Sequence, residues 1–217
     1  MAEGQMNGRM RALLVTLAIL GGCTTAPVYY PTVNEQVITL RKGDLEAAGL
    51  AFITPSTVTG QEQEKEAVAL TFTDVLRRER PALRVSTLAE TLGAVNKGGF
   101  ADGYKRMYDE YRDTGLFSAQ ALGRIGAATG RRYVAQLNLQ GFSQSSKGRF
   151  GFLGLRLVET HYADVRLFFT IWDSRDGSIA WAAMQELRIA RESTSEEPLM
   201  LRQVLEHSAR ELIARLP

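Results

Sequence analysis

The chain has few of the residues on which most enzymes and disulfide-rich proteins depend. Its 217 residues include one cysteine, two histidines and two tryptophans. A single cysteine excludes a disulfide within the chain, so the fold has to be stabilised by its packed core. Neither His161 nor His207 stands in a catalytic motif or at the spacing of a metal site. The sequence therefore predicts a protein without metal, cofactor or enzymatic activity.

Long apolar runs and a strong net charge are also absent. The apolar run at residues 12–20 is too short for a membrane-spanning helix, which needs about 20 residues. Lys and Arg number 26 against 24 Asp and Glu, which leaves the chain close to neutral. Domains that bind nucleic acid are normally strongly basic, so we expect no nucleic-acid partner.

The short apolar run has the features of a secretory signal. Two arginines precede it, and small residues with the only cysteine follow it. The pattern resembles the lipobox of bacterial lipoproteins, which implies cleavage before the cysteine and acylation of its thiol. An uncleaved membrane anchor and an ordinary buried thiol are the alternatives. The residues of this motif are Leu20, Gly21, Gly22 and Cys23.

These features divide the chain into a signal peptide (residues 1–22), a lipidated tether (residues 23–36) and a single domain (residues 37–217). Pro27 and Pro31 and the lack of a helical period predict that the tether is extended, with a reach of at most about 43 Å. Thr24 stands where an Asp would signal retention at the inner membrane of familiar diderm bacteria. That resemblance implies a lipid anchor in the outer membrane, at its periplasmic face.

The hydrophobic pattern of the domain predicts an α/β fold of the α+β sandwich type. We expect a mixed, largely antiparallel sheet of about five strands with helices packed on it, a long C-terminal β-hairpin and a terminal helix. Trp172, Phe168 and Met184 lie on the second face of the hairpin and call for a cover, either a helix of this chain or another subunit. The expected strands are residues 37–40, 50–53, 83–86, 133–139, 162–172 and 179–189. The expected helices are residues 44–48, a helix opened by a capping box of Thr59 with Glu62 and running to about residue 80, and residues 88–95, 100–111, 118–129 and about 196–216.

Tyrosines recur at helical spacing between residues 100 and 111. Such a stripe usually faces the core, but tyrosine also suits a protein interface because its ring is apolar and its tip polar. We therefore take Tyr104 and Tyr108 as candidate partner contacts and keep the core as the alternative.

A glycine-containing segment lies between Phe142 and Tyr162. It lacks the Gly-Lys-Ser/Thr ending of a phosphate-binding loop, and its irregular alternation predicts a flexible loop. Phe150 and Phe152 place apolar side chains on this loop, which makes them candidates for contact with lipid or with a partner protein.

The order of elements resembles the periplasmic α/β domain of the curli-secretion lipoprotein CsgG and the penicillin-binding-protein activator LpoB. The matching stretches are a helix that ends at Gly130 before a strand at Tyr133, and a hairpin from Ala163 to Trp181 that turns at residues 173–177. The resemblance covers residues 50–216 and concerns packing and turn signals, so it bears on the fold far more than on any activity.

The resemblance and the signal segment together predict an accessory or scaffold subunit of a cell-envelope assembly, with envelope proteins as partners and a homo-oligomer possible. An activator of a peptidoglycan synthase and a subunit of a curli-type secretion pore are the alternatives. The 19 residues between Phe142 and Tyr162 barely accommodate two membrane-crossing strands, and the tether is short for reaching a synthase in the inner membrane.

Overall fold

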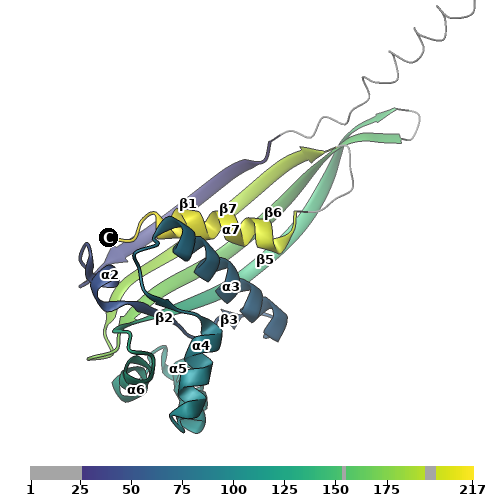
Figure 1. The fold of residues 1–217 in the computed structure, drawn as a ribbon. Coiled ribbons are helices and arrows are strands. Elements are labelled where there is room, and N and C mark those ends of the chain that lie inside the picture. Colours follow the sequence, from purple (N-terminus) through teal and green to yellow (C-terminus); the bar gives the residue numbers. More distant parts are fainter. Residues whose placement is uncertain (1–25, 153–154, 194–198) are drawn as a thin grey trace, which may run out of the picture.

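The computed structural model describes residues 26–152, 155–193 and 199–217. For residues 148–152, 155–158 and 193 it describes the backbone only. Seven strands form one mixed sheet in the order β1-β7-β6-β5-β2-β4, with β3 paired to β5 (Figure 1). The strands are β1 Val28–Val37, β2 Leu50–Phe52, β3 Ser56–Thr57, β4 Val85–Ser86, β5 Tyr133–Phe152, β6 Leu155–Asp173 and β7 Ile179–Ser193. The helices are α2 Asp44–Ala48, α3 Glu62–Glu79, α4 Leu88–Lys97, α5 Ala101–Thr114, α6 Ala119–Thr129 and α7 Leu201–Ile213.

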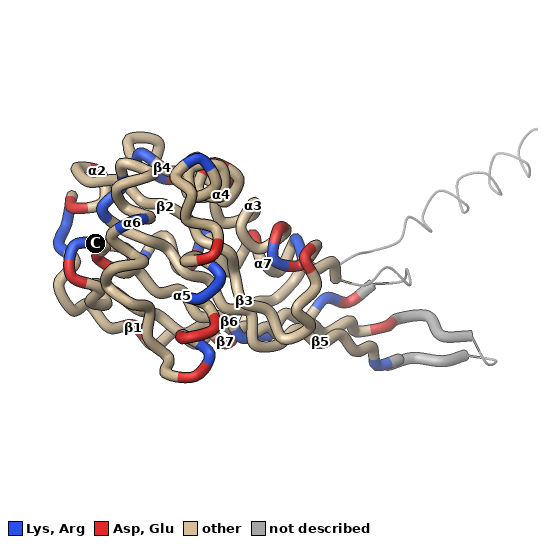
Figure 2. Tube along the Cα trace, turned by 90° about the horizontal axis from the view of Figure 1, so that it is seen from below, with Lys and Arg blue, Asp and Glu red and all other residues tan. Residues whose placement is uncertain are grey.

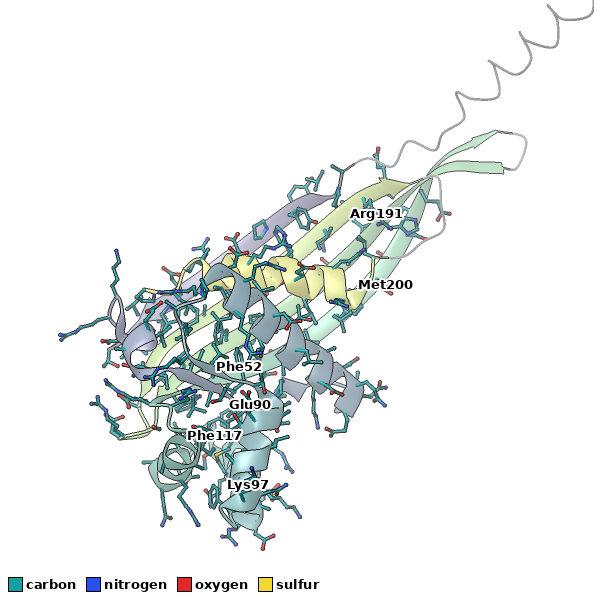
Figure 3. The ribbon with its side chains drawn as sticks, viewed as in Figure 1. Phe52, Glu90, Lys97, Phe117, Arg191 and Met200 are labelled. Carbon is teal, nitrogen blue, oxygen red and sulfur yellow. The ribbon has the colours of Figure 1, made fainter. Side chains whose placement is uncertain are left out.

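The helices lie on both faces of the sheet but cover them unequally. Helices α3 and α7 pack side by side on one face and bury the larger core against β5, β6 and β7. Helices α4, α5 and α6 gather at one end and bury a smaller core over Val134 and Trp172 on the other face. Phe52 lies in the larger core and Phe117 in the smaller one (Figure 3). The α+β sandwich is confirmed, with seven strands where the sequence predicted about five.

Local capping explains why several helices begin where they do. Ser118 accepts a hydrogen bond from the Ala121 N–H at 3.2 Å to start α6, and Gly130 ends the helix with φ 64°. Thr87 and Glu90 form a capping box at α4 that the sequence analysis missed. The capping box predicted for Thr59 is wrong, because α3 begins after Gln61 without a side-chain cap.

The predicted tether is extended, but most of it belongs to the sheet. Strand β1 pairs antiparallel with β7 from Val28, opposite Ala190, to Val37, opposite Trp181. The strand expected at residues 37–40 is therefore wrong, because β1 lies earlier in the chain and ends at Val37. An edge strand bonds to one neighbour only, so it tolerates Pro31, and from the sequence it looks the same as an extended tether.

The flexible loop predicted between Phe142 and Tyr162 is also wrong. Strands β5 and β6 pair as far as Phe152 and Leu155 and form a hairpin that projects beyond the other strands (Figure 1). Register shifts at Gly141 and around Phe150 explain why the sequence lacks strict alternation. At the far end of the chain, α7 starts at Leu201, and the predicted start near residues 196–198 lies outside the described residues.

Candidate functional site

Among the described residues, only the α4–α6 group covers the face of the sheet opposite α3 and α7, and the rest of that face is open. A shallow groove of about 930 Å³ lies on this face and crosses β1, β7, β6 and β5. Phe168 and Met184, which the sequence predicted to need a cover, are half-buried, whereas Trp172 lies under the α4–α6 group. The groove is lined by Tyr30, Thr32, Gln140, Gly141, Phe142, Ser143, Asp164, Val165, Arg166, Glu186, Leu187 and Arg188. We call this surface the open-face groove.

Two cross-strand ion pairs dominate the chemistry of the open-face groove. Arg188 donates to Asp164 at 2.6 Å, and Arg166 lies 2.6 Å from Glu186. Each pair joins residues directly opposite each other on β6 and β7. The hydrogen bond from Arg188 to Asp164 raises the pKa of the guanidinium. Each charge in the groove is matched by an opposite charge on the neighbouring strand. As a binding partner, the groove therefore favours a polar protein surface of mixed charge over a single ion.

Tyr104 and Tyr108, the candidate partner contacts on α5, pack in the smaller core, where Tyr104 is buried and Tyr108 is half-buried. The Thr54 N–H donates to the Tyr104 hydroxyl at 2.8 Å, and the Tyr108 hydroxyl donates to the Thr54 carbonyl oxygen at 2.6 Å. Tyr104 is only 9% exposed, and burial raises the pKa of both phenols. The two rings therefore fasten α5 to the residues after β2, and the core alternative for the tyrosine stripe is correct.

Phe150 and Phe152 lie on the projecting part of β5, where they pair with Val158 and Leu155. Their side chains lie outside the described part of the structure, so their role as contacts stays a prediction. Cys23 and the cleavage residues at 20–22 also lie outside the described residues.

The two histidines occupy different settings. His161 is buried on β6 opposite Arg191, and its Nε2 lies 3.9 Å from a Glu159 oxygen. The His207 ring on α7 is half-buried and stacks on Tyr29, with centroids 3.7 Å apart and planes at 9°. Burial lowers the pKa of His207. The described residues contain no group of three His, Cys, Asp or Glu side chains arranged to hold a metal ion.

The most perturbed carboxyl belongs to a clasp that the sequence analysis missed. Asp173 is buried, which by itself would raise its pKa, but hydrogen bonds from Arg132 and Arg175 lower the pKa to about 2. Arg132 reaches Asp173 at 2.6 Å and Arg175 at 3.0 Å. The clasp ties the β6–β7 turn to the start of β5 and lies at the other end of the sheet from the hairpin. Its position in a turn between buried strands shows a structural role.

Charges elsewhere are mixed in sign. In the view of Figure 2, Lys and Arg segments lie interspersed with Asp and Glu segments along the helices and loops. No helix in the described ranges combines the length and hydropathy needed to cross a bilayer.

Comparisons with known proteins give weak structural similarities only. No family model and no curated protein sequence matches the chain. The PelC dodecamer from Paraburkholderia phytofirmans is similar with a TM-score of 0.45 and 15% identity, over 86% of this chain and 94% of that one. Lipoprotein GNA1162 from Neisseria meningitidis is similar with a TM-score of 0.36 and 15% identity, over 77% of this chain and 98% of that one. The LpoB C-terminal domain from Salmonella enterica is similar with a TM-score of 0.34 and 12% identity, over 64% of this chain and 82% of that one. Similarities of this size assign no function.

Proposed function

We propose that this chain is a non-enzymatic lipoprotein, held by a lipid on Cys23 at the periplasmic face of the outer membrane, and that it serves as an accessory or scaffold subunit of a cell-envelope assembly. The open-face groove is the surface through which it binds a protein partner. The anchor part of the proposal comes from the Leu20-Gly21-Gly22-Cys23 motif. The binding part comes from the structure of the sheet.

The observation that carries the binding role is the unequal cover of the two sheet faces. Within the described part of the chain, one face is packed under α3 and α7 along β5, β6 and β7, whereas the other is packed only at one end, under α4–α6. On this second face, beyond the α4–α6 group, Phe168 and Met184 remain half-buried beside the exposed Arg166 and Glu186. Apolar side chains framed by charges are typical of a protein-binding surface.

The chemistry of the groove supports binding more than catalysis. Its four charged side chains form two ion pairs with each other, which leaves these carboxylates engaged as hydrogen-bond acceptors for arginine. A general base would instead need a carboxylate or imidazole aimed at a substrate site. His161 and His207 do not line the groove.

A photo-crosslinking experiment in cells tests the binding role. A photoreactive amino acid replaces Met184 in the full-length lipoprotein, and the matched control carries it at Leu70, which is 51% exposed on α3. We expect a discrete adduct with an envelope protein from position 184 and none from position 70. Equal labelling at both positions, or no adduct at position 184, would overturn the proposal.

The identity of the crosslinked protein separates the narrower roles. A peptidoglycan synthase in the adduct would specify the activator role, and an adduct with a second copy of this chain would specify a homo-oligomeric scaffold. The pore role has less support, because β5 extends only five residues past Lys147, close to the point where its pairing through β6 to β7 ends. A membrane-crossing strand takes about 9 to 11 residues.

A further inference from the structure

Strand β1 forms one edge of the sheet and has a free outer side. It pairs with β7, and among the described strands none lies on its other side (Figure 1). The opposite edge of the sheet is β4, which has two residues, whereas β1 has ten. The outer side of β5 beyond Leu139 is also free, but a register shift at Gly141 interrupts it. Strand β1 is therefore the long regular edge to which a further strand can be added.

This edge has little of the protection that edge strands usually carry. Lysines, prolines, bulges or a covering segment normally prevent the free backbone groups from pairing with another chain. Strand β1 has no lysine or arginine, no register shift and one acidic residue, Glu35, and its single protective residue is Pro31. Five of the nine large apolar side chains that are exposed in the described structure belong to residues 28–38. An edge of this kind is expected to have a partner in the working protein.

The backbone of β1 turns its odd-numbered residues outward. The Ile38 N–H donates to the Ala180 carbonyl oxygen at 3.1 Å, in the same register as the β1–β7 pairs. Because the bonding side alternates along an antiparallel strand, the even-numbered residues bond to β7 and the odd-numbered residues face away from it. Pro31, which has no N–H to donate, falls in the outward set, as expected for a proline in an edge strand. The outward residues are Tyr29, Pro31, Val33, Glu35 and Val37.

This outward set is self-complementary when a second β1 pairs antiparallel to it with the centre at Val33. Tyr29 then lies opposite Val37 of the second copy. Pro31 lies opposite Glu35 of the second copy, and every outward N–H meets a carbonyl oxygen. A centre at Glu35 would instead place two carboxylates opposite each other, and a centre at Pro31 would place two prolines opposite each other. The sequence of the edge therefore favours one register, which has a two-fold axis.

Helix α7 leaves room for this pairing. It packs on β7 and β6, one and two strands in from the edge. The β7 strands of two paired copies would be three strand spacings apart, so the two α7 helices would lie at least about 14 Å from each other. Helices in direct contact lie about 8 to 10 Å apart. The second copy therefore meets no helix that blocks its approach, and long side chains can span the gap.

The charges above β1 match their own two-fold image. The His207 ring on α7 stacks on Tyr29, and Arg215 just after α7 lies 3.9 Å from Glu35, so the helix runs above β1 in the direction of the strand. Glu211 lies between them along the helix, 3.0 Å from Arg215. The two-fold axis makes the helices antiparallel and brings Arg215 level with Glu211 of the second copy. Opposite charges thus face each other twice across the axis.

We propose that β1 pairs antiparallel with β1 of a second copy of this chain, about a two-fold axis at Val33, so that the two sheets join into one. A second copy fits better than an unrelated strand, because both the outward backbone groups and the charges of α7 complement themselves. The pairing extends the sheet in its own plane and leaves the open-face groove available to another protein. It goes beyond the proposed function, since it requires neither the lipid nor the groove.

Sedimentation equilibrium of the full-length protein in detergent tests the pairing. V33P removes the outward N–H at the centre without removing a bond to β7, and V33A is the matched control because it shortens the side chain and keeps the N–H. P31A restores the donor that the edge lacks. We expect a reversible dimer for the wild type, a Kd at least about tenfold higher for V33P and far less changed for V33A. P31A should lower the Kd about tenfold, because the dimer gains two hydrogen bonds.

Disulfide formation tests the register. Val33 lies opposite its own counterpart at a spacing that a disulfide can bridge, so V33C should form a covalent dimer under mild oxidation in detergent and in native membranes. V37C is the control, because it faces Tyr29 of the second copy and lies about 26 Å along the strand from its own counterpart. Wild-type protein that oxidises to a dimer would reveal a free Cys23 thiol, which contradicts the lipid anchor, and the sedimentation of P31A then decides the pairing.

Three results would overturn the inference. The first is a monomer at every concentration for both the wild type and P31A; a gain with P31A cannot arise from lost folding, so this comparison stands even if V33P unfolds. The second is a dimer whose Kd is unchanged in folded V33P, because another surface would then hold the copies together. The third is equal oxidation of V33C and V37C, which would exclude the register centred at Val33.

Discussion

The two ends of the long strands differ in how completely they are covered. At the end near α2 and α6, the sheet has a core on both faces and the Asp173 clasp closes the β6–β7 turn. Towards the hairpin the second face is open, first at the open-face groove and then along strands that project beyond their neighbours. Stability is therefore concentrated at the covered end, and the surfaces available for binding are concentrated at the hairpin end.

The largest effect should come from removing a core residue at the covered end. Trp172 is buried against the α4–α6 group, and its indole N–H donates to Gln136 at 3.0 Å. Trp172→Ala should lower the free energy of unfolding by about 3 to 5 kcal/mol, because it leaves a cavity and an unpaired buried amide. Urea unfolding followed by circular dichroism measures the change.

The control for Trp172 is Phe168, which lies on the same face of β6, four residues closer to the hairpin. Phe168 is only half-buried, so Phe168→Ala should cost much less than Trp172→Ala. If the two variants lost equal amounts of unfolding free energy, Phe168 would be covered as fully as Trp172. The proposed difference between the two ends of the sheet would then be wrong.

The next effect concerns the clasp. Asp173 has a pKa of about 2, below its ordinary value near 3.8, so its charged form stabilises the fold above pH 4 and this contribution is lost as the pH falls from 4 to 2. Asp173→Asn should lower the free energy of unfolding at pH 7 by about 1 to 2 kcal/mol, a figure kept small by solvent screening of the partly exposed arginines. The variant should also lose stability less steeply below pH 4, which acid titration of the unfolding midpoint measures.

The sequence predicted the covered end far better than the hairpin end, and the reason is the range of the interactions. The α6 boundaries follow from Ser118 and Gly130, which act within one helical turn. The pairing of β1 with β7 joins residues more than 140 positions apart, so local patterns left residues 28–36 as a tether. The hairpin at residues 142–162 was hidden by its register shifts.

The candidate site shows the same division. The need for a cover over Trp172 was visible in its pattern, because apolar residues on a second sheet face are a local signal. The core roles of Tyr104 and Tyr108 could not be seen in the local pattern, because their hydrogen-bond partner Thr54 lies about fifty residues away in the sequence. The ion pairs of the groove depend on the register of β6 and β7, which brings Arg166 opposite Glu186 only after the hairpin has formed.

A smaller effect of opposite sign is expected beneath α7. Gln185 is completely buried on β7, and the described residues offer neither its amide nitrogen nor its amide oxygen a hydrogen bond. Gln185→Met should raise the free energy of unfolding by about 1 kcal/mol, because a side chain of similar size replaces a buried polar group that lacks a partner. Differential scanning calorimetry measures the gain as a higher Tm; a lower Tm would show that the amide is satisfied in solution.

The smallest effect concerns the attachment of β1 at the hairpin end. His207 stacks on Tyr29, and burial lowers its pKa below the ordinary 6.5, while Glu211 and Arg210 act on it in opposite directions. A lowered pKa means that the neutral ring stabilises the fold fully above pH 6.5 and that this contribution declines as the pH falls below 6.5. Hydrogen exchange in β1 should therefore quicken severalfold between pH 7 and pH 5, after correction for the intrinsic rate, and should do so more than in the middle of β6. His207→Phe keeps a stacked ring without a titratable group, so it should remove most of this pH dependence; an unchanged dependence would assign it to another group and leave the stack as a passive contact.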